Sequence, residues 1–388
     1  MIKYKRKKDT AILLLMGRER SGKTVSAIAG FSTLAKGVAS SKQTVRLSLR
    51  TDEADEHETV PTDRLTKAYL SMKRGRDLPG KTENDQIYRF RLEKNGHEVC
   101  RLAQLDYPSG LRSAKSPAEE QDEAFNSFLA HASILTFVLP GDLLQSYIQL
   151  GGKTLEEVTD PVRMENFLSI NREINHIKTL LLKAGEANPH APLLFYVTKS
   201  DLVAYPQNIP LVLERLLREW NLLDGNRKVL GCSSTLGKNA VINGNQIRSG
   251  FAPEGFEIPL LLAAARRQYV RGQKWNEKEI RFIDGTIRRL LQERDEAAAS
   301  RAALTVYLQT KLIKLFCPEK KTIRELGKRI AQLDKTLFEK EKEKEMIPKR
   351  NPHQKHARDI LSYIEAAYPN EVLYINKNGQ KRKLQDFI

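Results

Sequence analysis

Hydrophobic positions follow two patterns along this chain. Up to about residue 270, short apolar or alternating runs take turns with stretches whose apolar residues recur at helical spacing. The first kind predicts strands and the second predicts helices packed against them. Strands are predicted at 11–16, 45–49, 87–92, 98–105, 133–139, 193–197 and 228–232, and helices at 25–34, 63–73, 117–131, 162–183, 209–220 and 258–270.

Strands that alternate with helices predict an α/β fold, in which helices cover both faces of a mostly parallel, doubly wound sheet. One antiparallel hairpin interrupts that order. The runs 87–92 and 98–105 flank Asn95-Gly96, and Asn-Gly between alternating runs is the strongest short-range hairpin signal. A second hairpin is predicted around Asn243-Gly244.

Beyond about Gly272 the strand pattern ends. Residues 277–316 have the pattern of a long, charged, amphipathic helix, and the apolar positions from Ile323 to Leu337 repeat at spacings of three and four, typical of a helical hairpin. Residues 347–352 are predicted to be a linker, followed by a helix at 353–367 and a hairpin at 372–375 and 380–384. The predicted domains are therefore 1–271, 272–346 and 347–388.

The first strand leads into a glycine-rich motif, Gly17-Arg18-Glu19-Arg20-Ser21-Gly22-Lys23-Thr24, and a helix follows it. Strand, loop and helix are the context that G-x-x-x-x-G-K-[ST] requires to bind phosphate through backbone N–H groups, the lysine and the helix N-terminus. The alternative is a chance glycine turn. The predicted nucleotide contacts here are Gly17, Arg20, Ser21, Gly22, Lys23, Thr24 and Val25.

Polar residues also stand where three later strands end. Asp106 ends one strand, where a carboxylate can hold Mg²⁺ through water. The motif Thr198-Lys199-Ser200-Asp201 ends another, and an aspartate there can accept two hydrogen bonds from guanine, a pattern that adenine does not offer. Cys232-Ser233-Ser234 ends the next strand and can direct backbone N–H groups at the base.

This ordered set resembles the P-loop GTPases of the translation-factor and Ras-like class, and within it bacterial single- or double-GTPase proteins, some of them defence-associated. The resemblance covers residues 9–270 and implies a Ras-like, three-layer P-loop NTPase domain that binds GTP or GDP with Mg²⁺. It implies catalytic roles for Lys23, Thr82 and Asp106, and metal ligation by Thr24, Thr82 and Asp106. It also implies base recognition by Thr198, Lys199, Asp201, Cys232, Ser233 and Ser234.

The switch elements depart from that pattern. Thr82 is the candidate for the switch I threonine, but it can equally be a threonine that starts a strand, and Thr59, Thr62 and Thr66 compete for the role. After Asp106 the glycine comes one residue late, at Gly110, and no glutamine directly follows it. Glu19 and Arg20 also place charge in the middle of the loop. These departures predict slow hydrolysis of GTP to GDP and phosphate.

Composition limits the cellular environment that the sequence fits. The chain has 388 residues, a mean hydropathy of -0.49 and no stretch of the ~20 apolar residues that a membrane helix needs. Its three cysteines are far apart and accompany no histidine cluster, so neither a disulfide framework nor a zinc site is indicated. A cytoplasmic protein without a membrane span is the resulting expectation.

The net charge of +17 is concentrated near the C-terminus, since residues 266–388 hold 29 Lys and Arg against 17 Asp and Glu. This excess fits a solvated helical bundle, a surface for a protein effector or partner subunit, or nucleic-acid binding. Two functions stay open: a GTP-dependent molecular switch that signals to a protein partner, and a nucleic-acid-associated P-loop NTPase. A P-loop kinase is a more distant third.

Overall fold

The computed structural model describes residues 10–18, 21–39, 46–51, 62–76, 78–79, 86–106, 119–151, 160–223, 227–237, 239–243, 246–310, 319–369, 372–375 and 384. They belong to two compact units. Unit 1 comprises residues 1–268 and 356–388, and unit 2 comprises residues 269–355.

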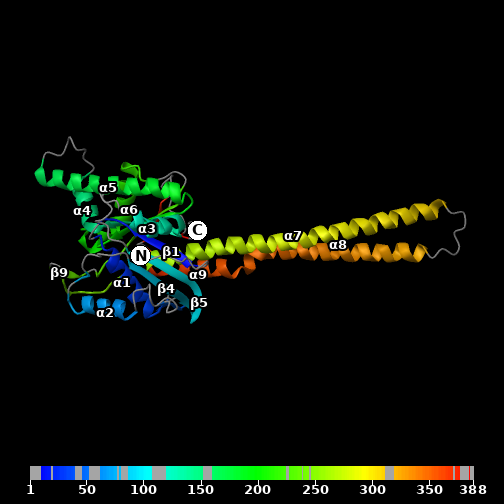
Figure 1. Ribbon diagram of the computed structural model, residues 1–388, viewed down its shortest axis with the longest axis horizontal. Coiled ribbons are helices and arrows are strands. Elements are labelled where there is room, and N and C mark those ends of the chain that lie inside the picture. Colours follow the sequence, from blue (N-terminus) through cyan, green and yellow to red (C-terminus); the bar gives the residue numbers. More distant parts are fainter. Residues whose placement is uncertain are drawn as a thin grey trace. The chain divides into compact units, whose positions relative to one another are not determined.

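Unit 1 is built on a nine-stranded sheet with the order β11-β8-β7-β6-β1-β5-β4-β3-β2. Figure 1 labels β1, β4 and β5 of this sheet. Its strands are β1 (Thr10–Met16), β2 (Val38–Ala39), β3 (Arg46–Thr51), β4 (Gln86–Lys94), β5 (His97–Asp106), β6 (Ile134–Pro140), β7 (Leu193–Thr198), β8 (Val229–Ser233) and β11 (Val372–Ile375). The five central strands, from β8 to β5, are parallel. The predicted α/β class and its mostly parallel core are therefore confirmed.

Helices cover both faces of this sheet. They are α1 (Lys23–Ala35), α2 (Thr62–Lys73), α3 (Glu119–His131), α4 (Gly141–Leu150), α5 (Pro161–Ala187) and α6 (Ile209–Glu219). On one face, Ile12 and Leu14 of β1 share a core cluster with Phe128 of α3 and Ile174 of α5. On the other, Phe31 of α1 stacks on β4, because alternate strand residues point to opposite faces. All seven residues of β1 are buried, as its apolar run predicts.

The antiparallel part of the sheet is larger than the one predicted hairpin. That hairpin is present as β4 and β5, but β3 pairs antiparallel with β4, and β2 with β3. At the opposite edge β11 pairs antiparallel with β8, with Val372 opposite Cys232. The segment predicted as a separate C-terminal unit thus completes the main sheet. The hairpin expected at Asn243-Gly244 forms as β9 (Val241–Asn243) and β10 (Gln246–Ser249), a sheet of its own.

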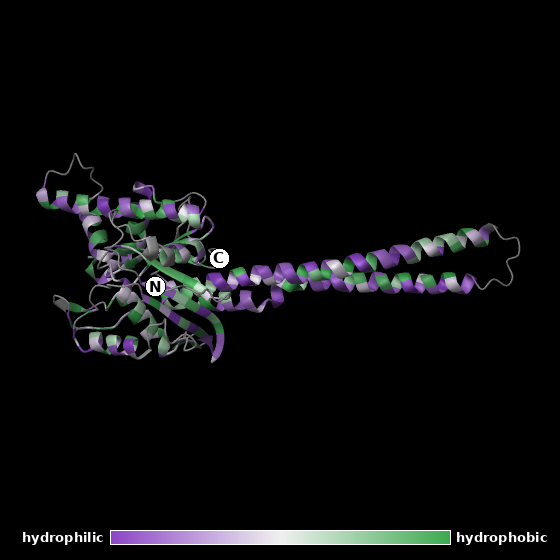
Figure 2. Ribbon diagram, in the orientation of Figure 1, coloured by the Kyte–Doolittle hydropathy of each residue, from purple (hydrophilic) through white to green (hydrophobic). Residues whose placement is uncertain are grey.

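Unit 2 is a helical hairpin. Helix α7 (Ile258–Thr310) begins in unit 1 and supplies the first arm from residue 269 onward, and α8 (Glu319–Arg350) supplies the second. The arms run antiparallel, since Arg294 contacts Asp334 whereas Asp284, earlier on α7, contacts Lys344. Figure 2 shows hydrophilic and hydrophobic residues alternating along both arms. The predicted stripe forms the seam, with Leu333 and Leu337 buried.

Two predicted interruptions in this region are wrong. Helix α7 is continuous where a break was predicted between the helices 258–270 and 277–316. Gly272, within this stretch, allows close packing. Its carbonyl oxygen accepts a hydrogen bond from Asn351 Nδ2 at 2.7 Å, and a Cβ would lie 2.8 Å from Gln354. The expected linker 347–352 is instead a helix corner. Helix α8 extends past Pro348, and Asn351 Oδ1 then accepts N–H groups of His353 and Gln354 at the start of α9 (Pro352–Ala367). The predicted strand 380–384 lies outside the described residues except for Leu384.

Candidate functional site

The loop between β1 and α1 depends on its two glycines. Gly22 stands directly before α1 with a φ of 91°, a left-handed conformation that favours glycine. A Cβ on Gly17 would lie 2.8 Å from the carbonyl oxygen of Val138 on β6. Both positions therefore need glycine for the loop to fit against the neighbouring strand ends. Glu19 and the predicted contact Arg20 lie outside the described residues.

Lys23, the first residue of α1, turns back under this loop. Its side chain is buried at 6% exposure, and Nζ donates to the carbonyl oxygens of Gly17 at 2.9 Å and Arg18 at 2.8 Å. The ammonium group therefore stabilises the loop conformation while lying beside the loop's backbone. Val25, the other predicted contact on this helix, is half-buried.

Thr24 and Asp106 meet at the ends of two adjacent strands. Strands β1 and β5 are parallel with Leu14 opposite Leu105, so Asp106 follows at the carboxyl edge next to the loop. There Thr24 Oγ1 donates to Asp106 Oδ2 at 2.6 Å, and Asp106 is only 1% exposed. A hydroxyl and a carboxylate are hard oxygen ligands, which is the donor chemistry that Mg²⁺ prefers. The third predicted ligand, Thr82, lies outside the described residues, and the described part contains no cluster of three acidic, His or Cys ligands.

Thr198 links the end of β7 to the same loop. Its Oγ1 donates to the carbonyl oxygen of Ser21 at 2.6 Å, and a Cβ on Gly22 would lie 3.4 Å from its side chain. After it, Lys199 adopts a left-handed φ of 53° and Ser200–Leu202 forms a 3-10 helix, η4. The chain therefore turns sharply at the strand end and presents Lys199 and Asp201, both half-buried, beyond it.

The end of β8 holds this turn in place. Ser234 N donates to Val197 O at 2.8 Å, and Ser200 N donates to Ser234 O at 3.1 Å. Thr235 Oγ1 then donates to Asp201 Oδ1 at 3.1 Å and accepts Gly237 N at 3.0 Å, which orients the carboxylate. Thr235 was missed by sequence reasoning, although it directly follows the predicted Cys232-Ser233-Ser234 motif.

Cys232 has a different setting from the loop residues. It lies within β8, opposite Tyr196 of β7 and Val372 of β11, and its side chain is 2% exposed. Burial raises the pKa of its thiol well above the ordinary value. Ser233 is the last residue of the strand, so the loop that can face a ligand begins at Ser234.

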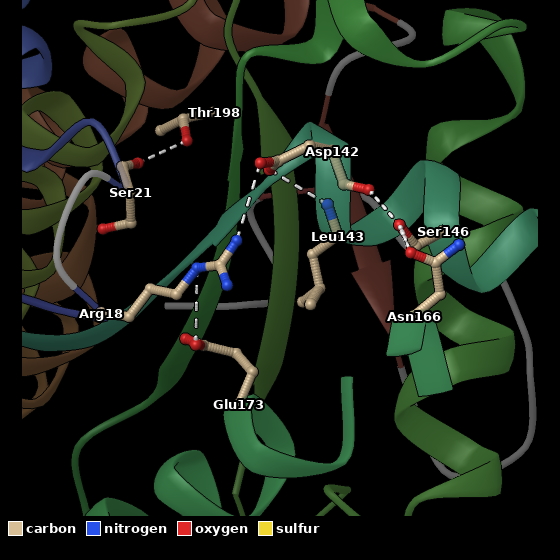
Figure 3. A network of polar contacts seen from close by, with 8 residues as sticks. All are labelled: Arg18, Ser21, Asp142, Leu143, Ser146, Asn166, Glu173 and Thr198. Atoms are coloured by element: carbon tan, nitrogen blue, oxygen red, sulfur yellow. Dashed lines mark hydrogen bonds and ion pairs between the residues drawn. The ribbon is translucent and has the colours of Figure 1, made fainter. Parts of the chain in front are cut away.

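A charged cluster surrounds the Arg18 side chain, as Figure 3 shows. The guanidinium of Arg18 points to Asp142 of α4, 3.6 Å away, and to Glu173 of α5, 3.8 Å away. Glu173 is 4% exposed, and burial raises the pKa of its carboxyl, while the charge of Arg18 opposes that rise. Burial and the nearby charge of Lys23 lower the pKa of His176 on the same helix.

Sequence reasoning missed this cluster too, although a signal was present. Position 173 is three residues after Ile170 and four before Ile177, so a helix places it on the same face as that apolar stripe. A carboxylate on a buried face needs a partner.

No protein-family model matches this chain. No curated protein matches it at a significant level either. Its fold and candidate site define an α/β protein whose β1–α1 loop meets the carboxyl ends of β5 and β7. Among its described helices, none combines the length and apolar character needed to cross a bilayer.

Proposed function

We propose that this protein binds guanine nucleotides together with Mg²⁺ and acts as a nucleotide-dependent switch that hydrolyses GTP slowly. The observation that carries the proposal is the hydrogen bond from Thr198 to the carbonyl oxygen of Ser21. It joins the candidate base-recognition turn to the candidate phosphate loop. Ligands of open α/β sheets bind at the carboxyl ends of the strands, where these two segments meet.

The phosphate part of the proposal rests on the loop and Lys23. Backbone N–H groups at the start of α1 and the helix dipole favour an anion there. Lys23 would move its ammonium group from the carbonyls of Gly17 and Arg18 to phosphate oxygens. Thr24 and Asp106 would hold Mg²⁺, which neutralises phosphate charge when bound.

The base part rests on Asp201. Its carboxylate, oriented by Thr235, can accept two N–H groups from guanine, while the aliphatic stem of Lys199 packs on the base plane. Slow hydrolysis rests on sequence, because Glu19, Arg20 and Gly110 lie outside the described residues. A protein effector would detect the nucleotide state of the switch.

The test is the binding of GDP, GTP, ATP and xanthosine diphosphate to the wild type and to Asp201→Asn. We expect the variant to lose about 10- to 100-fold in affinity for GDP and GTP, because it loses a bidentate acceptor. It should gain affinity for xanthosine diphosphate, whose second carbonyl accepts from the new amide. Asp295→Asn, an exposed site on α7, is the control. Equal wild-type affinity for ATP and GTP would contradict guanine recognition.

One observation favours the second candidate, a nucleic-acid-associated NTPase. Between residues 298 and 330, the described part of the hairpin carries six exposed Lys and Arg side chains against two Glu. Such a cationic surface can neutralise backbone phosphates. A salt-dependent shift of DNA or RNA by the full chain would support this candidate, and a loss of that shift on charge reversal of Lys320 and Arg324 would locate it.

A further inference from the structure

Contacts within the β1–α1 loop converge on Arg18. Its carbonyl oxygen accepts hydrogen bonds from Lys23 Nζ at 2.8 Å and from Ser21 N at 3.4 Å. Its guanidinium reaches Glu173 and Asp142 on the opposite side, toward α4 and α5 (Figure 3). The conformation of the loop therefore depends on what holds this one residue.

Glu173 is an unusual partner for it. The other residues on that face of α5, Ile170, Ile174 and Ile177, are apolar and at most 1% exposed. Glu173 is 4% exposed, and within the described structure its Oε1 makes no hydrogen bond. Burying a carboxylate costs desolvation free energy that packing contacts do not offset, so an apolar residue at this position would stabilise the core more.

Binding of a phosphate changes which contacts hold the loop. In the present structure Lys23 Nζ donates to both Gly17 and Arg18. An ammonium group has three donors, so a Lys23 that donates to two phosphate oxygens keeps at most one of these carbonyls, and the occupied loop loses part of its internal support. The Glu173–Arg18 ion pair and the Thr198–Ser21 hydrogen bond do not involve Lys23 and can persist.

We propose that Glu173 is a positioning residue of the nucleotide site, which anchors the phosphate loop through Arg18 when Lys23 turns to the phosphates. It acts on the polyphosphate and not on the base. The inference rests on the proposed nucleotide binding but does not require guanine recognition. Its characteristic consequence is that affinity falls when the anchor is removed, although the empty protein keeps its stability.

The test is a double-mutant cycle with Glu173→Gln, Arg18→Gln and the combined variant in the full chain. Dissociation constants are measured for fluorescent GDP and ADP at fixed Mg²⁺. Each single change should weaken the tighter-binding nucleotide by about tenfold, because each removes a charged contact of the loop. The double variant should lie within about twofold of Arg18→Gln, since that variant already lacks the ion pair that Glu173→Gln removes.

Thermal unfolding without nucleotide separates positioning from a structural role. The midpoint of Glu173→Gln should stay within about 2 °C of wild type or rise, because the change removes a buried charge, while the Arg18 side chain is 38% exposed and keeps Asp142 as a partner. Glu165→Gln neutralises an exposed carboxylate on the same helix and should leave affinity unchanged.

Three results would overturn the proposal: unchanged affinity in both single variants, additive losses in the double variant, or no binding of either nucleotide by wild type. If Glu173→Gln does not fold, Arg18→Gln still tests the proposal. The Arg18 side chain is 38% exposed, so its replacement should not prevent folding. Binding of ADP in preference to GDP would contradict guanine recognition while the cycle still tests the anchor.

Discussion

Helix α7 belongs to both compact units and behaves differently in each. In unit 1 every residue from Ile258 to Ala265 is buried, so the helix packs on all sides. Within the described part of unit 2, α7 buries only Gly272, Ile283 and Ala297, and Phe282 is 70% exposed. A helix buried on all sides is held in position by packing in every direction, whereas a helix in a two-helix hairpin is packed along one face only. The candidate site lies in the unit of the first kind.

Core truncation should show the largest difference between the two units. Phe195 of β7 is fully buried and stacks on Phe137 with ring centroids 5.4 Å apart, so Phe195→Ala should destabilise unit 1 by about 3–5 kcal/mol. Leu337→Ala opens a seam where the side chain is already 8% exposed, and should cost about 2 kcal/mol.

Denaturant unfolding followed by tryptophan fluorescence measures both changes. The chain has two tryptophans, Trp220 directly after α6 in unit 1 and Trp275 on α7 in unit 2. Replacing either one by Phe leaves a fluorescence signal from the other unit alone. Equal losses for the two core variants would mean that the hairpin is packed as fully as the sheet, and would remove the contrast.

Two glycines should give effects of opposite sign. A Cβ on Gly141, at the start of α4, would lie 2.1 Å from the carbonyl oxygen of Lys199, so Gly141→Ala should cost about 1–3 kcal/mol. A Cβ on Gly285 in α7 meets nothing within 4 Å, so Gly285→Ala should stabilise by about 0.5–1 kcal/mol through helix propensity.

The same unfolding experiment decides the sign of each glycine effect. Gly141→Ala should also weaken the proposed nucleotide binding, because Lys199 belongs to the candidate base-recognition turn, whereas Gly285→Ala should not. A stabilised Gly141→Ala variant would show that the contact between α4 and η4 yields easily, and that the turn is not held as tightly as the core around it.

The smallest predicted effect is one of pH. Glu257, just before α7, is fully buried and accepts a hydrogen bond from Tyr368, yet burial still raises the pKa of its carboxyl. The native state therefore holds this proton more tightly than the unfolded state. Its contribution to stability is complete below the unfolded pKa and is lost as pH rises through the folded value.

Glu257→Gln should remove this pH dependence. The unfolding free energy of the variant should therefore rise relative to that of wild type between pH 5 and pH 8, by no more than about 1 kcal/mol. Glu341→Gln, at an exposed position of α8, is the matched control and should show no such gain. A variant that loses stability at pH 8 would mean that the charge itself stabilises unit 1.

Local patterns predicted the elements and the motif positions well. The apolar run of β1, the glycines of the loop and the strand end at Asp106 are properties of neighbouring residues, so they can be read directly. The tertiary contacts of those residues cannot be predicted in this way, because their partners are distant in sequence. Glu173 lies 155 positions after Arg18, and no local rule connects the two.

Two errors have the same cause. The sequence predicted separate helices at 258–270 and 277–316, but α7 is continuous, and the missing side chain of Gly272 between them allows the approach of Asn351, which is distant in sequence. The strand β11 looked like half of a separate hairpin, because its pairing with β8 depends on a chain reversal through the whole of unit 2. Tertiary contacts at long sequence separation leave little trace in local periodicity.

The position of β11 also has a consequence for biosynthesis. It follows β8, whose outer edge it covers, by about 140 residues. Translation at about 5–20 residues per second leaves that edge unpaired for roughly 7–28 seconds. An open strand edge is a template for pairing with another chain. During synthesis there is therefore an interval in which the candidate site can already form while the edge of β8 is still unpaired and can aggregate with another chain.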